Sequence, residues 1–551
     1  MASLFHIPNE VFYSITSLLP NRDIKNLRLT CTRLSSHELR LDRVFLSPHP
    51  RDIEIFMCIA SHDSYRGRIV ELIYDDARFR RRVAHRSIGY DLDEDDPLDT
   101  HPAISPDRVI DGVPEWFICA YDDIQGDLER EPGRYITRPD HVEVAKQLES
   151  RLSIAQSYSQ YQRIVDEQNE TIAISADSRA LQYGLKQFPC LRKVTLTAVA
   201  HGLTFRPKYE TPFIRSLPYG FIYPIPRGWP ESRGVLPFAV TTKAWDADGV
   251  KEKWRGLRVL LRALVTHSHS VTEFVVDVNQ ILTGISLRIF DNPNEEYEDL
   301  VSLVRRPNFS RFDLALFAGD PEQVNWPSYR NGLLYNMFME AKDVQHVRLT
   351  TDLDPPEDIK MPAPYGTDGS EYFLPLRSLF PVHQWTQLRH FGLARFIVKQ
   401  DDLTSFLADM PPTLRSVELS FLSFIRIGGG SYLGLLLDMR EKLKWHERHT
   451  SERPKLTIFV DIDPPLFGRY VDISTEAEAV VYKNGKTPFA DQDYPELDSG
   501  NSVYRDLEVG IERNMFNSAD DCPFAEDDTL VKLGVYTEFD WPHPKPYLKN
   551  L

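Results

Sequence analysis

A short phrase recurs along this chain and constrains its fold more than any other sequence feature. The phrase reads L-x-x-Φ-x-Φ, where Φ is an apolar residue. In its second half apolar residues alternate with others, and alternate side chains of a β-strand point to the same face. Each copy therefore predicts a short strand, with the first apolar residue packed beneath the turn that enters it. The copies begin at Leu41, Ile69, Leu191, Val271, Phe309, Val344, Leu388, Leu414 and Leu456.

Helical stretches lie between the predicted strands, over residues 53–60, 175–188, 250–267, 401–410 and 432–449. Successive copies of the phrase start 28, 122, 80, 38, 35, 44, 26 and 42 residues apart. The short intervals fit one strand and one helix per unit, as in leucine-rich repeat solenoids. We therefore predict a mixed α/β fold, with a curved and irregular solenoid over residues 41–483. A compact α/β domain is the alternative.

The two long intervals predict insertions at about residues 80–188 and 200–248. The first contains the acidic loop 91–96 and further helical segments around 116–127 and 141–169. The second is rich in proline, glycine and aromatic residues, which predicts a long loop on one rim of the solenoid. At 551 residues the chain exceeds what one hydrophobic core usually serves, which agrees with this extended organisation.

Charge is distributed unevenly along the chain. The formal net charge is −17, which argues against sequence-independent binding to nucleic acid and against a polybasic membrane anchor. Residues 484–551 hold 14 acidic and 6 basic residues, nearly half of this excess. We expect this acidic C-terminal segment either to be partly disordered or to drape over the last repeats.

The cysteines indicate a reducing compartment. Cys31, Cys58, Cys119, Cys190 and Cys522 are far apart, odd in number and form no C-x-x-C motif. The sequence has no signal peptide and no apolar run of membrane-spanning length. We expect a cytoplasmic or nuclear protein that spans no membrane.

Enzyme motifs are absent or incomplete, so no catalytic residue, metal or cofactor is predicted. The stretch from Gly428 to Gly434 resembles a nucleophile elbow around Ser431, but Leu433 stands where the second glycine is required. His267 and His269 have no cysteine or acidic ligand at matching spacing, which favours surface and capping roles over a metal site.

Residues 1–40 follow a different pattern from the rest and predict three short helices. Ile7, Val11, Ile15, Leu18 and Leu19 fall on one face of the first helix. Ile24, Leu27, Cys31 and Leu34 continue an apolar stripe through the second and third. So small a unit buries too little surface for a stable core of its own. We therefore expect one face to pack on residues 41–79 and the other to be covered by a partner.

The order of residues in this segment resembles an F-box. The matching positions run Ile7-Pro8-x-Glu10-Val11, Leu18-Leu19-Pro20, Asp23-Ile24 and Leu27-Arg28 up to Arg33-Leu34. The departures are Ile7 for leucine, Thr32 before Arg33, and Leu34 for tryptophan. The following residues, with Val44–Ser47 and Gly67–Phe79, are similar to F-box proteins of filamentous fungi, whose remainder is commonly leucine-rich-repeat-like.

This resemblance implies the substrate-receptor subunit of an SCF-type ubiquitin ligase. Such a subunit binds a Skp-family adaptor, through it a cullin, and an unknown protein target through the solenoid, without catalytic residues of its own. The alternative is a protein-interaction scaffold that acts outside a ligase. A helix-turn-helix DNA reader is a further rival, although the charge of residues 1–50 is only +2. The adaptor-binding residues implied by the resemblance are Ile7, Pro8, Glu10, Val11, Ile15, Leu18, Leu19, Asp23, Ile24, Leu27, Cys31, Arg33 and Leu34.

Overall fold

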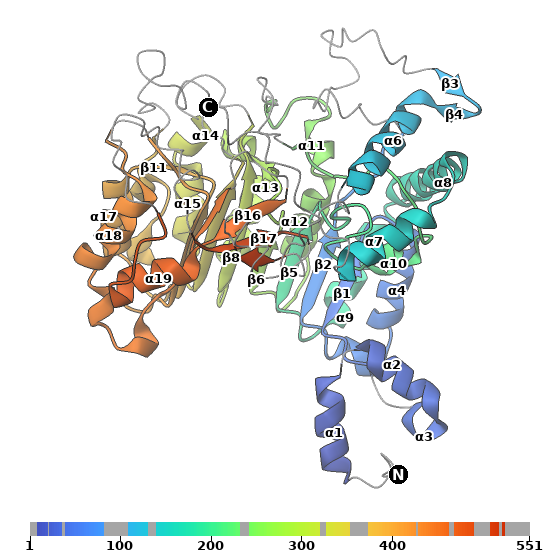
Figure 1. The fold of residues 1–551 in the computed structure, drawn as a ribbon, viewed down its shortest axis with the longest axis horizontal. Coiled ribbons are helices and arrows are strands. Elements are labelled where there is room, and N and C mark those ends of the chain that lie inside the picture. The colour runs from blue at the N-terminus through green and yellow to red at the C-terminus, as the bar shows by residue number, and fades with distance from the viewer. Residues whose placement is uncertain are drawn as a thin grey trace, which may run out of the picture.

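The computed structural model describes residues 8–19, 21–35, 39–81, 108–130, 139–231, 242–319, 327–352, 373–425, 428–461, 468–489, 507, 509–516 and 521–523. The molecule is mixed α/β, and its centre is a mostly parallel sheet (Figure 1). This is the fold class predicted from the sequence. The alternation of strands and helices along the sheet is compatible with a solenoid.

The recurring phrase forms the strands of one ten-stranded sheet. Neighbouring strands are parallel, and the third residue of each of the first eight copies faces the third residue of the next. In sheet order the strands are β1 (Arg43–Leu46), β2 (Glu71–Asp75), β5 (Lys193–Thr197), β6 (Glu273–Val276), β8 (Arg311–Phe317), β9 (His346–Thr351), β10 (His390–Ala394), β12 (Ser416–Ser420) and β14 (Lys455–Thr457), with β7 (Ile285–Ser286) beside β8.

The ninth copy of the phrase departs from this register. Lys455, which precedes the copy, faces Ser416, the third residue of the eighth copy. The second half of the ninth copy, predicted as a strand of the main sheet, instead forms β15 (Phe459–Asp461) in a separate antiparallel sheet. The periodic run of the main sheet therefore ends at β14.

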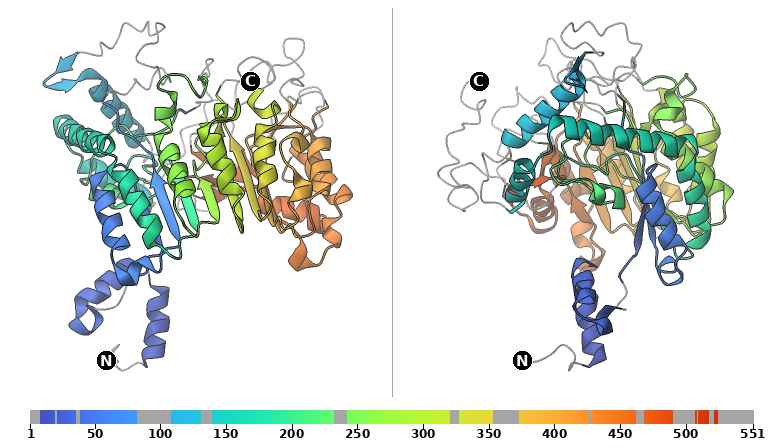
Figure 2. Two further views of the ribbon diagram at one scale, coloured as in Figure 1. Left: turned by 180° about the vertical axis from the view of Figure 1, so that it is seen from behind. Right: turned by 90° about the vertical axis from the view of Figure 1, so that its right-hand side faces the viewer.

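A row of helices covers one face of the sheet (Figure 2). Each helix packs against the next from α4 to α15 and again from α17 to α19. Between helices and sheet lies the main hydrophobic core, in which the fourth and sixth residues of the first eight phrases are at most 3% exposed. The helices are α4 (Pro50–Ala60), α9 (Ala176–Gln187), α12 (Arg255–Thr266), α13 (Glu295–Val304), α15 (Leu333–Glu340), α17 (Gln400–Ala408), α18 (Tyr432–Lys442) and α19 (Ser474–Lys483).

Shorter elements connect strands and helices. They are α5 (Asp63–Arg66), α11 (Val250–Lys253), α14 (Pro327–Arg330), the 3₁₀ helices η4 (Leu287–Phe290), η6 (Leu376–Ser378), η7 (Val382–Gln384), η8 (Trp445–Glu447) and η9 (Thr450–Glu452), and the parallel pair β11 (Ile397–Val398) and β13 (Ser423–Phe424).

The two predicted insertions meet in a second hydrophobic core. Phe117 and Tyr161 from the first insertion are buried there with Phe213 and Tyr223 from the second. The elements around this core are the hairpin β3 (Val109–Ile110) and β4 (Val113–Pro114), and the helices α6 (Glu115–Arg130), α7 (Pro139–Glu149), α8 (Ile154–Ala173) and α10 (Pro212–Ser216). Helix α9, although within residues 80–188, packs in the helix row of the main core.

A small antiparallel sheet brings part of the acidic C-terminal segment over the main sheet. It contains β15, β16 (Arg469–Asp472), β17 (Ile511–Asn514) and β18 (Cys522–Pro523), in that order. The side-chain amide of Asn279, just after β6, donates to the carbonyl of Met515 over 2.8 Å. In Figure 1, β16 and β17 pass in front of β6 and β8. Residues 509–516 thus reach the middle of the main sheet and not only its last strands.

The N-terminal residues form three helices, as predicted: α1 (Asn9–Leu18), α2 (Asn21–Thr30) and α3 (Thr32–Ser35). These helices, called here the three-helix unit, project from the edge of the main sheet where β1 begins (Figure 1). Asn21 ties α2 to the segment before β1, because its amide donates to the Arg40 carbonyl over 2.6 Å and accepts from the Arg40 N–H over 2.8 Å. None of the described helices of the chain combines the length and apolarity that crossing a bilayer requires.

Candidate functional site

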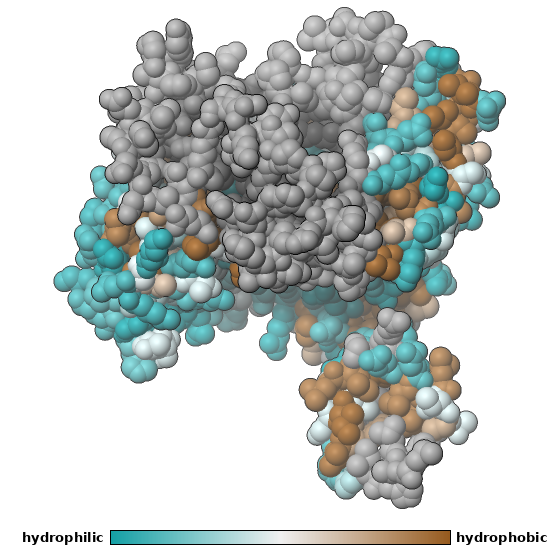
Figure 3. All heavy atoms as spheres, viewed as in Figure 1, coloured by the Kyte–Doolittle hydropathy of each residue, from teal (hydrophilic) through white to brown (hydrophobic). Residues whose placement is uncertain are grey.

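The three-helix unit presents apolar side chains to solvent along α1. Val11, Ile15 and Leu18 follow one another at spacings of four and three residues, which places them on one side of the helix. Their exposed fractions are 44%, 39% and 84%, and Leu29 of α2 is 86% exposed. Figure 3 shows brown, hydrophobic areas on the projecting unit. This surface is therefore a candidate interaction site.

The other residues implied by the resemblance range from buried to exposed. Ile24 and Leu34 are 1% and 7% exposed, so they form its interior. Leu19, Leu27 and Cys31 are half-buried. Pro8, which precedes the first residue of α1, is exposed, as are Glu10 and Asp23 in the first turns of α1 and α2. Ile7 and the side chain of Arg33 lie outside the described residues.

The unit shares no described residue with either large hydrophobic core. Both cores consist of residues from Leu41 onward. The expected packing of one helical face on residues 41–79 is therefore not confirmed as a core contact. The exposed side of α1 is left without an intramolecular apolar partner among the described residues that form these cores.

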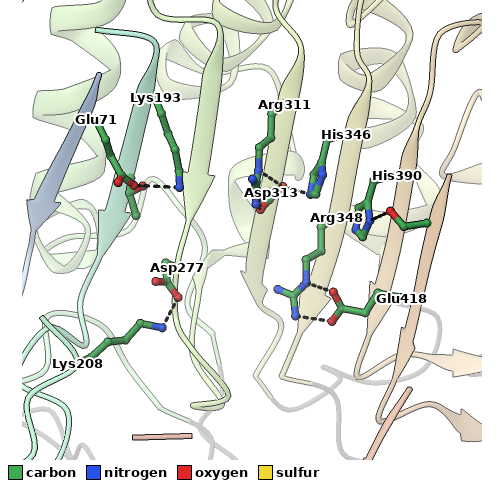
Figure 4. Close-up of polar contacts among 12 residues, drawn as sticks. Glu71, Lys193, Lys208, Asp277, Arg311, Asp313, His346, Arg348, His390 and Glu418 are labelled. Atoms are coloured by element: carbon green, nitrogen blue, oxygen red, sulfur yellow. Dashed lines mark hydrogen bonds and ion pairs between the residues drawn. The ribbon is translucent and has the colours of Figure 1, made fainter. Parts of the chain in front are cut away.

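A second candidate surface is the face of the main sheet opposite the helix row, called here the open face. The third residues of the phrases lie in line across it and include alternating charges (Figure 4). Glu71 is 2.6 Å from Arg43 Nε and 2.9 Å from Lys193 Nζ, so one carboxylate on β2 joins both neighbouring strands. Burial raises the pKa of Glu71, but Lys193 and Arg43 outweigh it and hold that pKa below its ordinary value.

Two imidazole rings stack in the middle of the open face. His346 and His390 lie on adjacent strands, with ring centroids 3.9 Å apart and an angle of 11° between the rings. His346 Nε2 is 2.9 Å from Asp313 Oδ1, and His390 Nδ1 is 2.7 Å from Ser416 Oγ. Burial, followed by the proximity of His346, lowers the pKa of His390 to about 3.

An ion pair crosses a whole strand on this face. Arg348 on β9 donates from Nε and Nη2 to Glu418 on β12, over 2.9 Å and 2.8 Å. Between them lies Gly392 of β10, which faces Arg348 on one side and Glu418 on the other. A Cβ atom at this position would lie 2.8 Å from Arg348 Cγ. Because Gly392 has no side chain, the Arg348 guanidinium has room to cross β10 and reach Glu418 (Figure 4).

The contact between Ser416 and His390 lacks the surroundings of a catalytic pair. A serine nucleophile requires N–H donors that stabilise the developing oxyanion. The backbone N–H groups of Arg415 and Ser416 both donate to the Arg389 carbonyl, over 2.7 Å and 3.0 Å. These neighbouring amides are consequently engaged in the sheet.

The side chains considered in the sequence as a possible nucleophile or metal ligand form local structural hydrogen bonds instead. Ser431 Oγ accepts from the N–H of Gly434 over 3.1 Å and caps α18. His269 Nε2 is 2.7 Å from the Leu264 carbonyl, and its Nδ1 accepts from the Val271 N–H, so it links α12 to β6. Within the described part of the chain, no group of three or more histidine, cysteine or acidic residues is placed to hold a metal ion.

No protein-family model matches the chain, and no curated protein matches its sequence. The candidate surfaces are therefore judged on geometry. The residues of the open face were missed as a site by sequence reasoning, although their signal was present. They are the third and fifth residues of the same phrases whose fourth and sixth residues predicted the core.

Proposed function

We propose that this chain is a non-catalytic substrate-recognition subunit of an SCF-type ubiquitin ligase. The three-helix unit would bind a Skp-family adaptor, which connects to a cullin. The strand–helix region would bind a protein target. The chain would accelerate ubiquitin transfer by holding a lysine of the target close to the loaded conjugating enzyme, without a catalytic residue of its own.

The observation that carries the proposal is the exposed apolar row Val11, Ile15 and Leu18 on a unit that lies outside both large cores. A folded chain that leaves such side chains in water gains free energy when a partner covers them, by about 1.5–3 kcal/mol for each fully buried large side chain. The resemblance of residues 7–34 to an F-box identifies the Skp-family adaptor as the partner to test.

Leu18 gives the sharpest substitution. Because its side chain is 84% exposed, Leu18→Asp should leave the fold intact and place a charge in the apolar row. We expect co-purification of the wild-type chain with a Skp-family adaptor in a 1:1 complex, and a loss of affinity of at least about tenfold in Leu18→Asp. Affinity is measured by titration calorimetry, with thermal unfolding as the check on folding.

Ile174→Asp is the matched control, because Ile174 is 54% exposed and lies after α8, far along the chain from the unit. It should bind the adaptor like the wild type. Failure of the wild-type chain to bind any Skp-family adaptor would refute the proposal. If the chain binds the adaptor but neither associates with a cullin nor has a ubiquitinated client, the result favours the alternative function, a protein-interaction scaffold.

A further inference from the structure

The edge of the main sheet where the strands begin carries a concentration of positive charge. Seven basic residues stand at the second and third phrase positions of the first eight copies and at Lys455, which β14 aligns with the third position: Arg43, Arg192, Lys193, Arg311, Arg389, Arg415 and Lys455. Only Asp42, Glu71 and Glu273 are acidic there. These two positions therefore total +4 in a chain whose net charge is −17. We call this strip the basic edge.

Several cations of the basic edge have no acidic partner. Arg192, Arg389, Arg415 and Lys455 are exposed, and none of them forms an ion pair with another described residue. Arg415 donates from Nη1 only to the backbone carbonyls of Pro412 and Leu414. The other three cations are already neutralised, because Arg43 and Lys193 contact Glu71 and Arg311 contacts Asp313.

The backbones of two of these cations are adjacent in the sheet. His390 faces Ser416, so Arg389 and Arg415 immediately precede the adjacent strands β10 and β12, and the N–H of Arg415 donates to the Arg389 carbonyl over 2.7 Å. Neighbouring strands are about 4.8 Å apart, and like charges directly opposite one another destabilise a sheet. An anionic group bound across both strands would relieve this repulsion.

The basic edge lies on the side of the molecule that bears the three-helix unit. All strands of this row are parallel to β1, and the chain enters β1 directly from the unit through Arg40 and Asp42. The strands therefore begin at the edge from which the unit projects (Figure 1). A partner held along this edge would lie beside whatever binds the exposed row of α1.

We propose that the basic edge binds an acidic segment of a partner protein, centred on Arg389 and Arg415. If the proposed function holds, on which this identification rests, the partner is a ligase target that carries such a segment. A protein segment suits the edge better than nucleic acid. Glu71 and Glu273 interrupt the positive charge along the edge, which disfavours the continuous phosphate backbone of a nucleic acid.

The test uses a fluorescently labelled poly-glutamate peptide and the full chain, with binding followed by anisotropy at low and physiological salt. The wild type should bind, and Arg389→Glu/Arg415→Glu should weaken binding about tenfold, because the reversals remove two attractive contacts and add two repulsive ones. Arg51→Glu/Arg163→Glu is the control with the same change of charge. These residues are exposed, each is paired with a glutamate, and they lie on α4 and α8.

Three outcomes would overturn the proposal: no binding of the peptide by the wild type, equal losses in both double variants, or tighter binding of single-stranded DNA that the edge reversal abolishes. Adaptor binding is measured in parallel on the same variants. If the wild type does not bind the adaptor, the ligase role is refuted. The basic edge is still supported if Arg389→Glu/Arg415→Glu weakens peptide binding more than Arg51→Glu/Arg163→Glu does. If Arg389→Glu/Arg415→Glu binds both the adaptor and the peptide like the wild type, the proposal for the basic edge is refuted and the proposed ligase role is unaffected.

Discussion

At the scale of the residue, the carboxyl groups where β2 ends are buried in unusual number. Asp75, Asp76 and Asp52 are at most 4% exposed. Asp76 accepts from the Trp229 indole over 2.8 Å, and Asp52 accepts from Ser47 and from the Phe213 N–H, each over 2.7 Å. These bonds connect the second insertion to β2 and α4. Burial raises the pKa of all three groups above the ordinary value.

Asp75 should make stability depend on pH. Burial raises its pKa from 3.8 to about 8, so in this window the folded chain holds a proton that the unfolded chain has lost. Stability contributed by this group is therefore present below the unfolded pKa and is lost as the pH rises toward about 8. Asp75→Asn keeps the acceptor for the Ala77 N–H and removes the ionisation. We expect the variant to exceed the wild type in unfolding free energy by about 1–3 kcal/mol above the folded pKa.

Chemical denaturation of both proteins across the window measures this difference. Asp52 and Asp76 are present in both proteins, so the difference between the two pH profiles reports the loss of the Asp75 carboxyl and of its repulsion with these two neighbours. A difference between variant and wild type that stays constant from acidic to alkaline pH would contradict the assignment.

At the scale of the element, the strands are held together by side chains that lie across them as well as by the backbone. Glu71 joins three strands through Arg43 and Lys193. Arg348 reaches Glu418 by passing over β10, where Gly392 has no side chain. The pair keeps two nearly buried charges satisfied, and a buried charge that loses its partner is costly.

Gly392→Ala should disrupt this crossing. The new methyl group would lie 2.8 Å from Arg348 Cγ and 3.1 Å from His390 Nε2, so the guanidinium has to move away from Glu418. We expect a loss of about 1–3 kcal/mol in the free energy of unfolding, measured by chemical denaturation. Gly67→Ala is the control, because Gly67 has φ −72° and no atom within 4 Å of the added methyl position. Equal effects of the two substitutions would show that the crossing contributes nothing.

At the scale of the whole molecule, the two large hydrophobic cores differ in how the chain builds them. The main core repeats along the sheet, with each strand and helix packed on the next. The second core joins residues that are far apart in sequence and contains many aromatic contacts. The ring centroids of Phe117 and Tyr161 are 5.4 Å apart, and those of Phe79 and Phe213 are 5.9 Å apart. We infer that the second core can lose its structure while the main sheet persists.

Phe117→Ala tests this independence. Phe117 is fully buried in the second core, so the substitution should cost about 3–5 kcal/mol locally. Hydrogen exchange should accelerate in α6, α7 and α8, while β5 to β12 keep the protection of the wild type. A parallel loss of protection in those strands would mean that both cores unfold as one cooperative unit.

Local periodicity in the sequence was enough to predict the repeating part of the fold. In each of the first eight phrases the fourth and sixth residues are buried together, and that local alternation predicts the eight phrase strands β1, β2, β5, β6, β8, β9, β10 and β12. The three short helices before Leu41 were predicted for the same reason, because their apolar residues recur at helical spacing. Local periodicity, however, could not locate the end of the main sheet. The second half of the copy at Leu456 has the same pattern as the others, but it forms β15 in the antiparallel sheet.

Contacts between residues far apart in the chain could be known only from the folded structure. It brought Phe117 and Phe213 into one core, placed Gly392 under an ion pair between two other strands, and set Arg389 beside Arg415. It also determined that Val11, Ile15 and Leu18 remain exposed while Ile24 and Leu34 are buried, a distinction absent from an apolar stripe. The physical reason is the same in each case. A sequence pattern fixes the direction in which a side chain points, whereas its neighbours depend on strand register and on packing between segments far apart in the chain.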